Sequence, residues 1–98
     1  MKLEFHPEAE MEFIEAAVYY ELQVLDLGVR FGAEVRRAAD LLMEHPEIGA
    51  RIDPELRQLI VGRFPFTLIY SVQPDVLQIV AVAHQRRQPG YWRSRVNR

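Results

Sequence analysis

The chain has 98 residues, of which 49% are hydrophobic and 27% are charged, as is typical of one small globular domain. It contains no cysteine, which excludes disulfide bonds and thiolate metal sites. Because no apolar run approaches the ~20 residues of a membrane span and the first ten residues lack the apolar stretch of a signal peptide, we expect a cytoplasmic protein that makes no membrane contact.

Charge is distributed unevenly along the chain. Residues 1–55 hold thirteen acidic and five basic residues, a net charge of −8, whereas residues 56–98 hold one acidic and seven basic residues, a net charge of +6. Two interpretations remain open at this stage. The C-terminal half faces a polyanion or an acidic partner, or an acidic helical layer merely packs against a basic sheet layer.

The first predicted elements are a short strand and a helix. Residues 2–6 alternate between polar and apolar side chains, as in a strand. Pro7 suits the first position of a helix, and the acidic residues after it favour the positive end of the helix dipole. Asp26-Leu27-Gly28 ends the helix. Its apolar residues recur at helical spacing and predict one buried stripe: Ala9, Phe13, Ala16, Ala17, Tyr20 and Val24.

A second helix is predicted from about Gly28 to His45, where Pro46 stops it because the residue before a proline resists helical geometry. The short connection predicts an antiparallel helical hairpin, and residues 46–55 are predicted to form a loop. The buried stripe of this helix comprises Phe31, Val35, Ala38, Ala39 and Leu42.

Three strands are predicted in the C-terminal half, at residues 57–63, 66–72 and 76–84. Pro65 marks a bend between the first two, and Gln73-Pro74-Asp75 forms a turn between the last two. The last strand is apolar on both faces and is therefore expected inside the sheet. Residues 1–98 are thus predicted to form a single α+β domain of order βααβββ, with the helical hairpin on one face of a mainly antiparallel sheet.

The core prediction joins the two layers. We expect helical residues to face sheet residues in a single core: Phe13, Tyr20, Phe31, Val35 and Leu42 against Leu59, Leu68, Tyr70 and Ile79.

Motifs for nucleotides, for zinc or for a nucleophile elbow are absent from the sequence, so we expect no cofactor and no metal. Glu8, Glu10, Glu12 and Glu15 are interpreted as a solvated acidic face. His84 ends the most apolar strand, beside several arginines. It is either a hydrogen-bonded strand-end side chain or a general base, since nearby positive charge disfavours its protonation.

Basic residues after Leu56 are the better candidates for function. Arg57 and Arg63 are predicted on one face of their strand. Arg86, Arg87, Arg93 and Arg95 cluster near the end of the chain with Tyr91 and Trp92. Arginine and aromatic side chains suit phosphates and bases, and they also dominate protein hot spots. Trp92 either belongs to this surface or folds back on the sheet and fixes the tail. The residues predicted to bind a target or a partner are Arg57, Arg63, Arg86, Arg87, Tyr91, Trp92 and Arg93.

Four segments in order resemble the RelE/ParE toxin superfamily: EFIEAAVYYE, LGVRFGAEVRRAADLLMEHPEIG, GRFPFTLIYSV and LQIVAVAHQRRQPGYWRSR. The most specific features are R-F-P-F-x-x-x-Y and the later H-x-x-R-x-P-x-Y-W. The resemblance implies a βααβββ fold and the toxin component of a type II toxin–antitoxin system. It also implies a cognate, ParD-like antitoxin that forms a hetero-oligomer with the toxin. Since the C-terminal half is basic, a segment that covers it is expected to be acidic and amphipathic.

The superfamily contains two activities, which the sequence separates in part. RelE-like members cut messenger RNA on the ribosome, and ParE-like members inhibit DNA gyrase. Thr67 stands where the RelE-like pattern has an arginine, and the loss of such a charge weakens transition-state stabilisation. The resemblance therefore favours a ParE-like gyrase inhibitor. The alternatives are a ribosome-dependent endoribonuclease, with Arg63, His84, Arg87 and Tyr91 as its catalytic residues, and a non-toxic binding module of the same fold.

Overall fold

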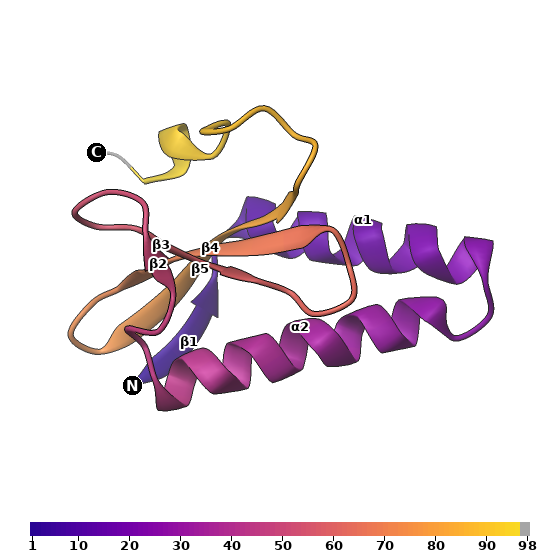
Figure 1. Cartoon of the computed structure of the whole chain (residues 1–98), viewed down its shortest axis with the longest axis horizontal. Coiled ribbons are helices and arrows are strands. Elements are labelled where there is room, and N and C mark those ends of the chain that lie inside the picture. Colours follow the sequence, from indigo (N-terminus) through magenta and orange to yellow (C-terminus); the bar gives the residue numbers. More distant parts are fainter. Residues whose placement is uncertain (97–98) are drawn as a thin grey trace.

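A computed structural model describes residues 1–96, and in it two helices pack on one face of a five-stranded sheet (Figure 1). The predicted α+β class is confirmed. The elements in chain order are β1 (Lys2–Phe5), α1 (Pro7–Gln23), α2 (Leu27–Glu44), β2 (Ala50–Arg51), β3 (Arg57–Ile60), β4 (Phe66–Val72), β5 (Val76–His84) and the short 3₁₀ helix η1 (Arg93–Arg95).

The strands are arranged in the order β1-β5-β4-β3-β2. β1 pairs with β5 in parallel, with Lys2 opposite Val76, and all the other pairs are antiparallel. The first strand therefore joins the later ones, as predicted, and β5 lies between β1 and β4. This position explains why β5 is apolar on both faces, since neither of its faces is left to solvent.

The helical hairpin turns at Asp26, which adopts a left-handed backbone conformation with φ of 70°. The carboxylate of Glu21 accepts hydrogen bonds from the Asp26 and Gly28 N–H groups at 2.8 and 3.0 Å, so a side chain of α1 caps the start of α2. Gly28 lies against the Ala17 carbonyl, and a Cβ at this position would collide with it. The hairpin therefore depends on glycine at this position, where α2 begins against α1.

The main core lies between the helices and the sheet, as predicted. Phe31, Val35 and Leu42 of α2 are buried against strand residues, and Phe31 stacks on Phe13 at 5.8 Å between ring centroids. Val24 departs from the prediction because it is 57% exposed. α1 ends at Gln23 and Val24 is extended, so helical spacing no longer applies to it. The other predicted core residues are buried or partly buried in the same cluster: Tyr20, Leu59, Leu68, Tyr70 and Ile79.

A second, smaller core lies on the opposite face of the sheet. We call residues 85–96 the tail; the tail crosses this face after β5 ends (Figure 1). Trp92 is 8% exposed and packs with sheet residues, so the tail folds back on the sheet. The buried members of this cluster are Leu56, Ile69, Val80, Ala81, Ala83 and Trp92.

The segment around Arg63 differs from the prediction. β3 ends at Ile60, and Arg63 lies in the following connection with a left-handed φ of 71°. It therefore does not share a strand face with Arg57. The predicted loop at residues 46–55 contains the two-residue strand β2, in which Arg51 pairs with Arg57. A strand this short leaves no alternation in the sequence to reveal it.

Candidate functional site

The tail is held by Glu12, which sequence reasoning placed in solvent. That prediction was wrong: the side chain of Glu12 is only 13% exposed. One of its oxygens, Oε1, accepts the Val82 N–H at 2.9 Å and Nη1 of Arg95 at 3.0 Å. The other, Oε2, accepts Nη2 of Arg95 at 2.8 Å and the hydroxyl of Tyr91 at 2.7 Å. One carboxylate thus joins α1, β5 and the tail.

The position of Glu12 follows from the shortness of β1. The last residue of β1, Phe5, lies opposite Ile79, and beyond it the edge of β5 has no neighbouring strand. Glu12 accepts the Val82 N–H at that edge, and Arg95 donates to the Val80 carbonyl at 3.1 Å. The two side chains replace the missing ladder bonds, because buried backbone groups need partners.

The same contacts shift the pKa values of Glu12 and Tyr91. Burial acts to raise the pKa of Glu12, but hydrogen bonds from Arg95, Tyr91 and Val82 outweigh it and hold the pKa below its ordinary value. Burial and the hydrogen bond to Glu12 raise the pKa of Tyr91 well above the ordinary value. The Tyr91 hydroxyl is therefore a committed donor, and it is poorly suited to accept a proton from a substrate.

Most of the tail arginines pair with acids of the N-terminal half. Arg87 lies 3.8 Å above the centre of the Tyr91 ring and 3.8 Å from Glu12 Oε2. Arg93 pairs with Asp53 at 3.0 Å, and Arg95 is only 7% exposed. The charge asymmetry of the sequence is thus partly neutralised inside the molecule. Within residues 1–96, Arg63 and Arg86 are exposed and form no ion pair.

Arg57 also has a structural position. Its Nη1 donates to the carbonyls of Glu47 and Gly49, both at 2.9 Å. Beside it, the buried hydroxyl of Tyr70 donates to the Pro46 carbonyl at 2.7 Å and accepts the Gly49 N–H at 3.0 Å. Together Arg57 and Tyr70 fix the segment between α2 and β2. Tyr70 is the tyrosine of the R-F-P-F-x-x-x-Y pattern, and sequence reasoning did not find this contact.

The end of the sheet brings the predicted ribonuclease residues close together. His84 pairs with Phe66 across β4 and β5, and the Gln85 N–H donates to the Pro65 carbonyl at 2.8 Å. The turn that carries Arg63 therefore lies beside the start of the tail. Nδ1 of His84 accepts the Arg86 N–H at 3.0 Å, which is the hydrogen-bonded role that the sequence left open.

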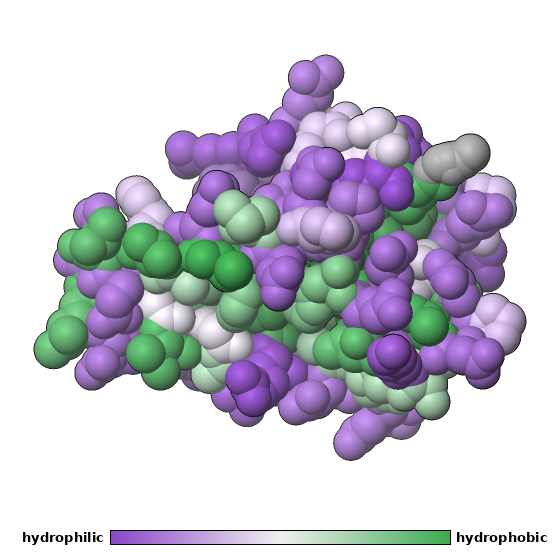
Figure 2. Space-filling model, turned by 180° about the vertical axis from the view of Figure 1, so that it is seen from behind, coloured by the Kyte–Doolittle hydropathy of each residue, from purple (hydrophilic) through white to green (hydrophobic). Residues whose placement is uncertain are grey.

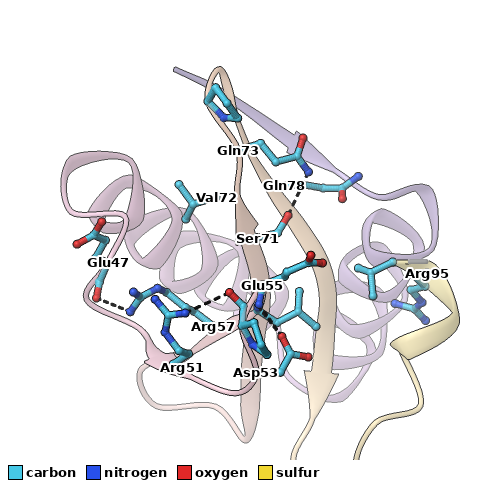
Figure 3. A pocket seen from close by; sticks show the side chains of 14 residues that line it. Glu47, Arg51, Asp53, Glu55, Arg57, Ser71, Val72, Gln73, Gln78 and Arg95 are labelled. Atoms are coloured by element: carbon cyan, nitrogen blue, oxygen red, sulfur yellow. Dashed lines mark hydrogen bonds between the residues drawn. The ribbon is translucent and has the colours of Figure 1, made fainter. Parts of the chain in front are cut away.

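A hollow of about 730 Å³ lies on the tail side of the sheet, between the segment around Asp53, the β4–β5 turn and η1 (Figure 3). Three arginines line it, but so do three acids, and the guanidinium groups of Arg57 and Arg95 are already bound within the chain. Hydrogen bonds from the Glu55 N–H and from Arg93 lower the pKa of Asp53. The hollow is therefore polar and close to neutral, and it lacks the excess positive charge of a polyanion site.

The outer side of α1 is apolar. We call its five exposed large apolar residues, together with Leu25 just after the helix, the α1 stripe; Figure 2 shows apolar side chains gathered in a row along this helix toward the tip of the hairpin. They are between 46% and 80% exposed, and such patches mark interaction surfaces. The α1 stripe comprises Met11, Ile14, Val18, Tyr19, Leu22 and Leu25.

Over residues 1–96, each helix is too short or too polar to cross a bilayer. The same residues contain no group of three or more His, Cys, Asp or Glu side chains placed to bind a metal ion.

Comparison with known proteins identifies the family. Residues 3–89 match the family model for the ParE toxin of the type II toxin–antitoxin system parDE. Among solved structures, a chain of the chromosomal ParDE system from P. aeruginosa has the same fold, with a TM-score of 0.74 and 18% identity over 86% of this chain and 95% of that one. No curated protein matches the sequence significantly. Since the family model spans nearly the whole chain, the protein belongs to the ParE toxin family of type II toxin–antitoxin systems.

Proposed function

We propose that this protein is a toxin that inhibits DNA gyrase through protein contacts and is neutralised by a cognate antitoxin. The observation that carries the proposal is the match of residues 3–89 to the ParE family, whose description names a type II toxin–antitoxin system. An antitoxin, and hence a hetero-oligomer, follows from that membership. Gyrase is chosen as the target because the sequence departs from the RelE-like pattern, above all at Thr67, where that pattern has an arginine.

The environment of the tail supports this choice over ribonuclease activity. A ribonuclease of this fold needs a proton acceptor and positive charge around the scissile phosphate. Here the Tyr91 hydroxyl is bound to Glu12, and Arg87 is close to the same carboxylate. A phosphate placed beside these two residues would meet the negative charge of Glu12. The tail therefore suits protein contacts better than phosphate cleavage.

The exposure of each side chain reduces the number of predicted residues that are free to contact a target. Trp92 and Arg57 stabilise the fold, and Tyr91 and Arg93 are held by Glu12 and Asp53. The exposed cations at the end of the sheet are Arg63, Arg86 and Arg87. We assign the gyrase-binding surface to these three residues, because exposed arginines are common at protein hot spots.

A supercoiling assay with the purified protein tests the target. Inhibition of gyrase at micromolar concentration, relieved by the antitoxin, is the expected result. Codon-specific cleavage of messenger RNA on translating ribosomes, with unaffected gyrase, would establish the ribonuclease alternative. A folded protein that neither slows growth nor affects either target would indicate a binding module.

A further inference from the structure

A groove of about 380 Å³ runs between α1 and the adjoining ends of β4 and β5, apart from the hollow described above. Its floor is apolar, since Phe66 and Val82 are buried there, and aromatic rings stand along its wall. The lining residues are Glu12, Glu15, Ala16, Tyr19, Tyr20, Phe66, Val82, His84 and Arg87.

We propose that this groove binds a basic side chain, an arginine or a lysine, of the partner segment that covers α1. The inference rests on the proposed function, in which that partner is the antitoxin. An aromatic ring and a carboxylate on one wall are the groups that hold a cation whose aliphatic stem lies on an apolar floor.

Glu15 and Tyr19 supply these two groups. They are four residues apart and therefore neighbours on the helix surface. Tyr19 is 60% exposed, and Glu15 is exposed and forms no ion pair within residues 1–96. Glu12, by contrast, is already neutralised by Arg95. Glu15 is thus the carboxylate of the groove that remains available to a partner.

The molecule contains a similar arrangement of its own at the rim. The guanidinium of Arg87 lies 3.8 Å above the Tyr91 ring and 3.8 Å from the Glu12 carboxylate. An aromatic ring and a carboxylate hold an arginine there, one helical turn from Glu15. Tyr19 and Glu15 present the same pair of groups outward, with the cation supplied by another chain.

Charge also selects the partner. α1 carries five glutamates and no basic residue. Glu15 and Tyr19 lie on the helix surface next to three apolar residues of the α1 stripe, Ile14, Val18 and Leu22. A second copy of this chain docked α1 to α1 would bring acids against acids. An amphipathic segment with basic residues at the edge of its apolar face is complementary to both features.

Two labelled peptides test the proposal by fluorescence anisotropy with the purified chain. Both are 20 residues long and share a leucine stripe at helical spacing. One carries arginines along the edge of the stripe, and the other carries glutamates. We expect the arginine peptide to bind at least tenfold more tightly. Equal affinity, or tighter binding of the glutamate peptide, overturns the proposal.

Matched variants locate the contact. Glu15→Gln and Tyr19→Leu should each weaken binding of the arginine peptide by about fivefold, the size of one cation–π or ion-pair contact. Glu10→Gln makes the same charge change on the same helix outside the groove, and should weaken binding by less than about twofold at physiological salt, where distant charges are screened. If Glu10→Gln and Glu15→Gln have equal effects, the groove is not the site.

The cognate antitoxin that the proposed function requires provides the second measurement. If it neutralises the toxin and binds the wild type, Glu15→Gln and Tyr19→Leu with equal affinity, the groove proposal is wrong while the proposed function stands. If it binds the wild type and loses affinity to Glu15→Gln and Tyr19→Leu but not to Glu10→Gln, the proposal is supported. A purified protein without effect on gyrase refutes the proposed target and leaves the binding measurements to decide on the groove.

Discussion

Glu12 and Arg95 lie 83 residues apart in the chain and form a two-pronged ion pair, with N···O distances of 3.0 and 2.8 Å. Their side chains are 13% and 7% exposed, and they cover the edge of β5 where β1 has ended. This pair makes the tail part of the folded structure.

Replacing Glu12 with glutamine should lower the free energy of unfolding by about 2–4 kcal/mol, because the mostly buried Arg95 would lose its buried charge partner and keep only its contact with the exposed Glu8. Urea denaturation measures this change. Trp92 is the only tryptophan, so a red shift of its fluorescence would report a loosened tail. Glu10→Gln, on the exposed side of the same helix, is the control. A change below about 0.5 kcal/mol for Glu12→Gln would show that the pair is not needed for stability.

Stability should fall in acid. The folded protein holds the pKa of Glu12 below its ordinary value of 4.5, and that of Asp53 below its ordinary value of 3.8. At a pH above these ordinary pKa values, both carboxylates therefore contribute their full stabilisation of the fold. This stabilisation is lost as the pH falls through the lower pKa values of the folded state. Urea midpoints measured from pH 7 down to pH 3 should decrease in this window. The decrease should be smaller in Glu12→Gln, and an equal decrease in both proteins would contradict the assignment.

Tyr70→Phe should destabilise the protein by about 1–3 kcal/mol, because it leaves the Pro46 carbonyl and the buried Gly49 N–H without their partner. Chemical denaturation gives the value. Tyr19→Phe removes a hydroxyl from an exposed tyrosine and should have little effect. If the two substitutions cost the same, the hydroxyl of Tyr70 does not fix the segment between α2 and β2.

Charge reversal at the end of the sheet tests the target surface. Arg63→Glu together with Arg86→Glu should abolish growth inhibition and leave the melting temperature within a few degrees of the wild type, since exposed charges away from ion pairs change stability little. Growth of induced cultures and thermal denaturation measure the two effects. Arg30→Glu with Arg36→Glu, at two exposed positions of α2, provides the matched control. Full toxicity of the Arg63/Arg86 variant would place the functional surface elsewhere.

Much of the fold could be predicted because its signals are local. The stripe from Phe31 to Leu42 is repeated every three to four residues, Pro46 stops the helix, and Gln73-Pro74-Asp75 makes a turn, each through interactions within a few positions. The apolar character of both faces of residues 76–84 also predicted a strand inside the sheet. The order of the motifs was sufficient to identify the superfamily.

The candidate site depended on contacts that local patterns do not encode. Glu12 follows an acidic helix start and resembles a solvated residue in the sequence. Because β1 is too short to cover the whole edge of β5, the Glu12 side chain instead bonds to Val82, Tyr91 and Arg95. A partner surface was one interpretation of the basic half of the sequence, but three of its arginines, Arg87, Arg93 and Arg95, pair with acids from the other half. Sequence by itself determined the helices, the strands other than the two-residue β2, and the family. Only the tertiary structure decided which charges remain exposed, because neutralisation depends on residues 40 to 87 positions apart coming within 4 Å of each other.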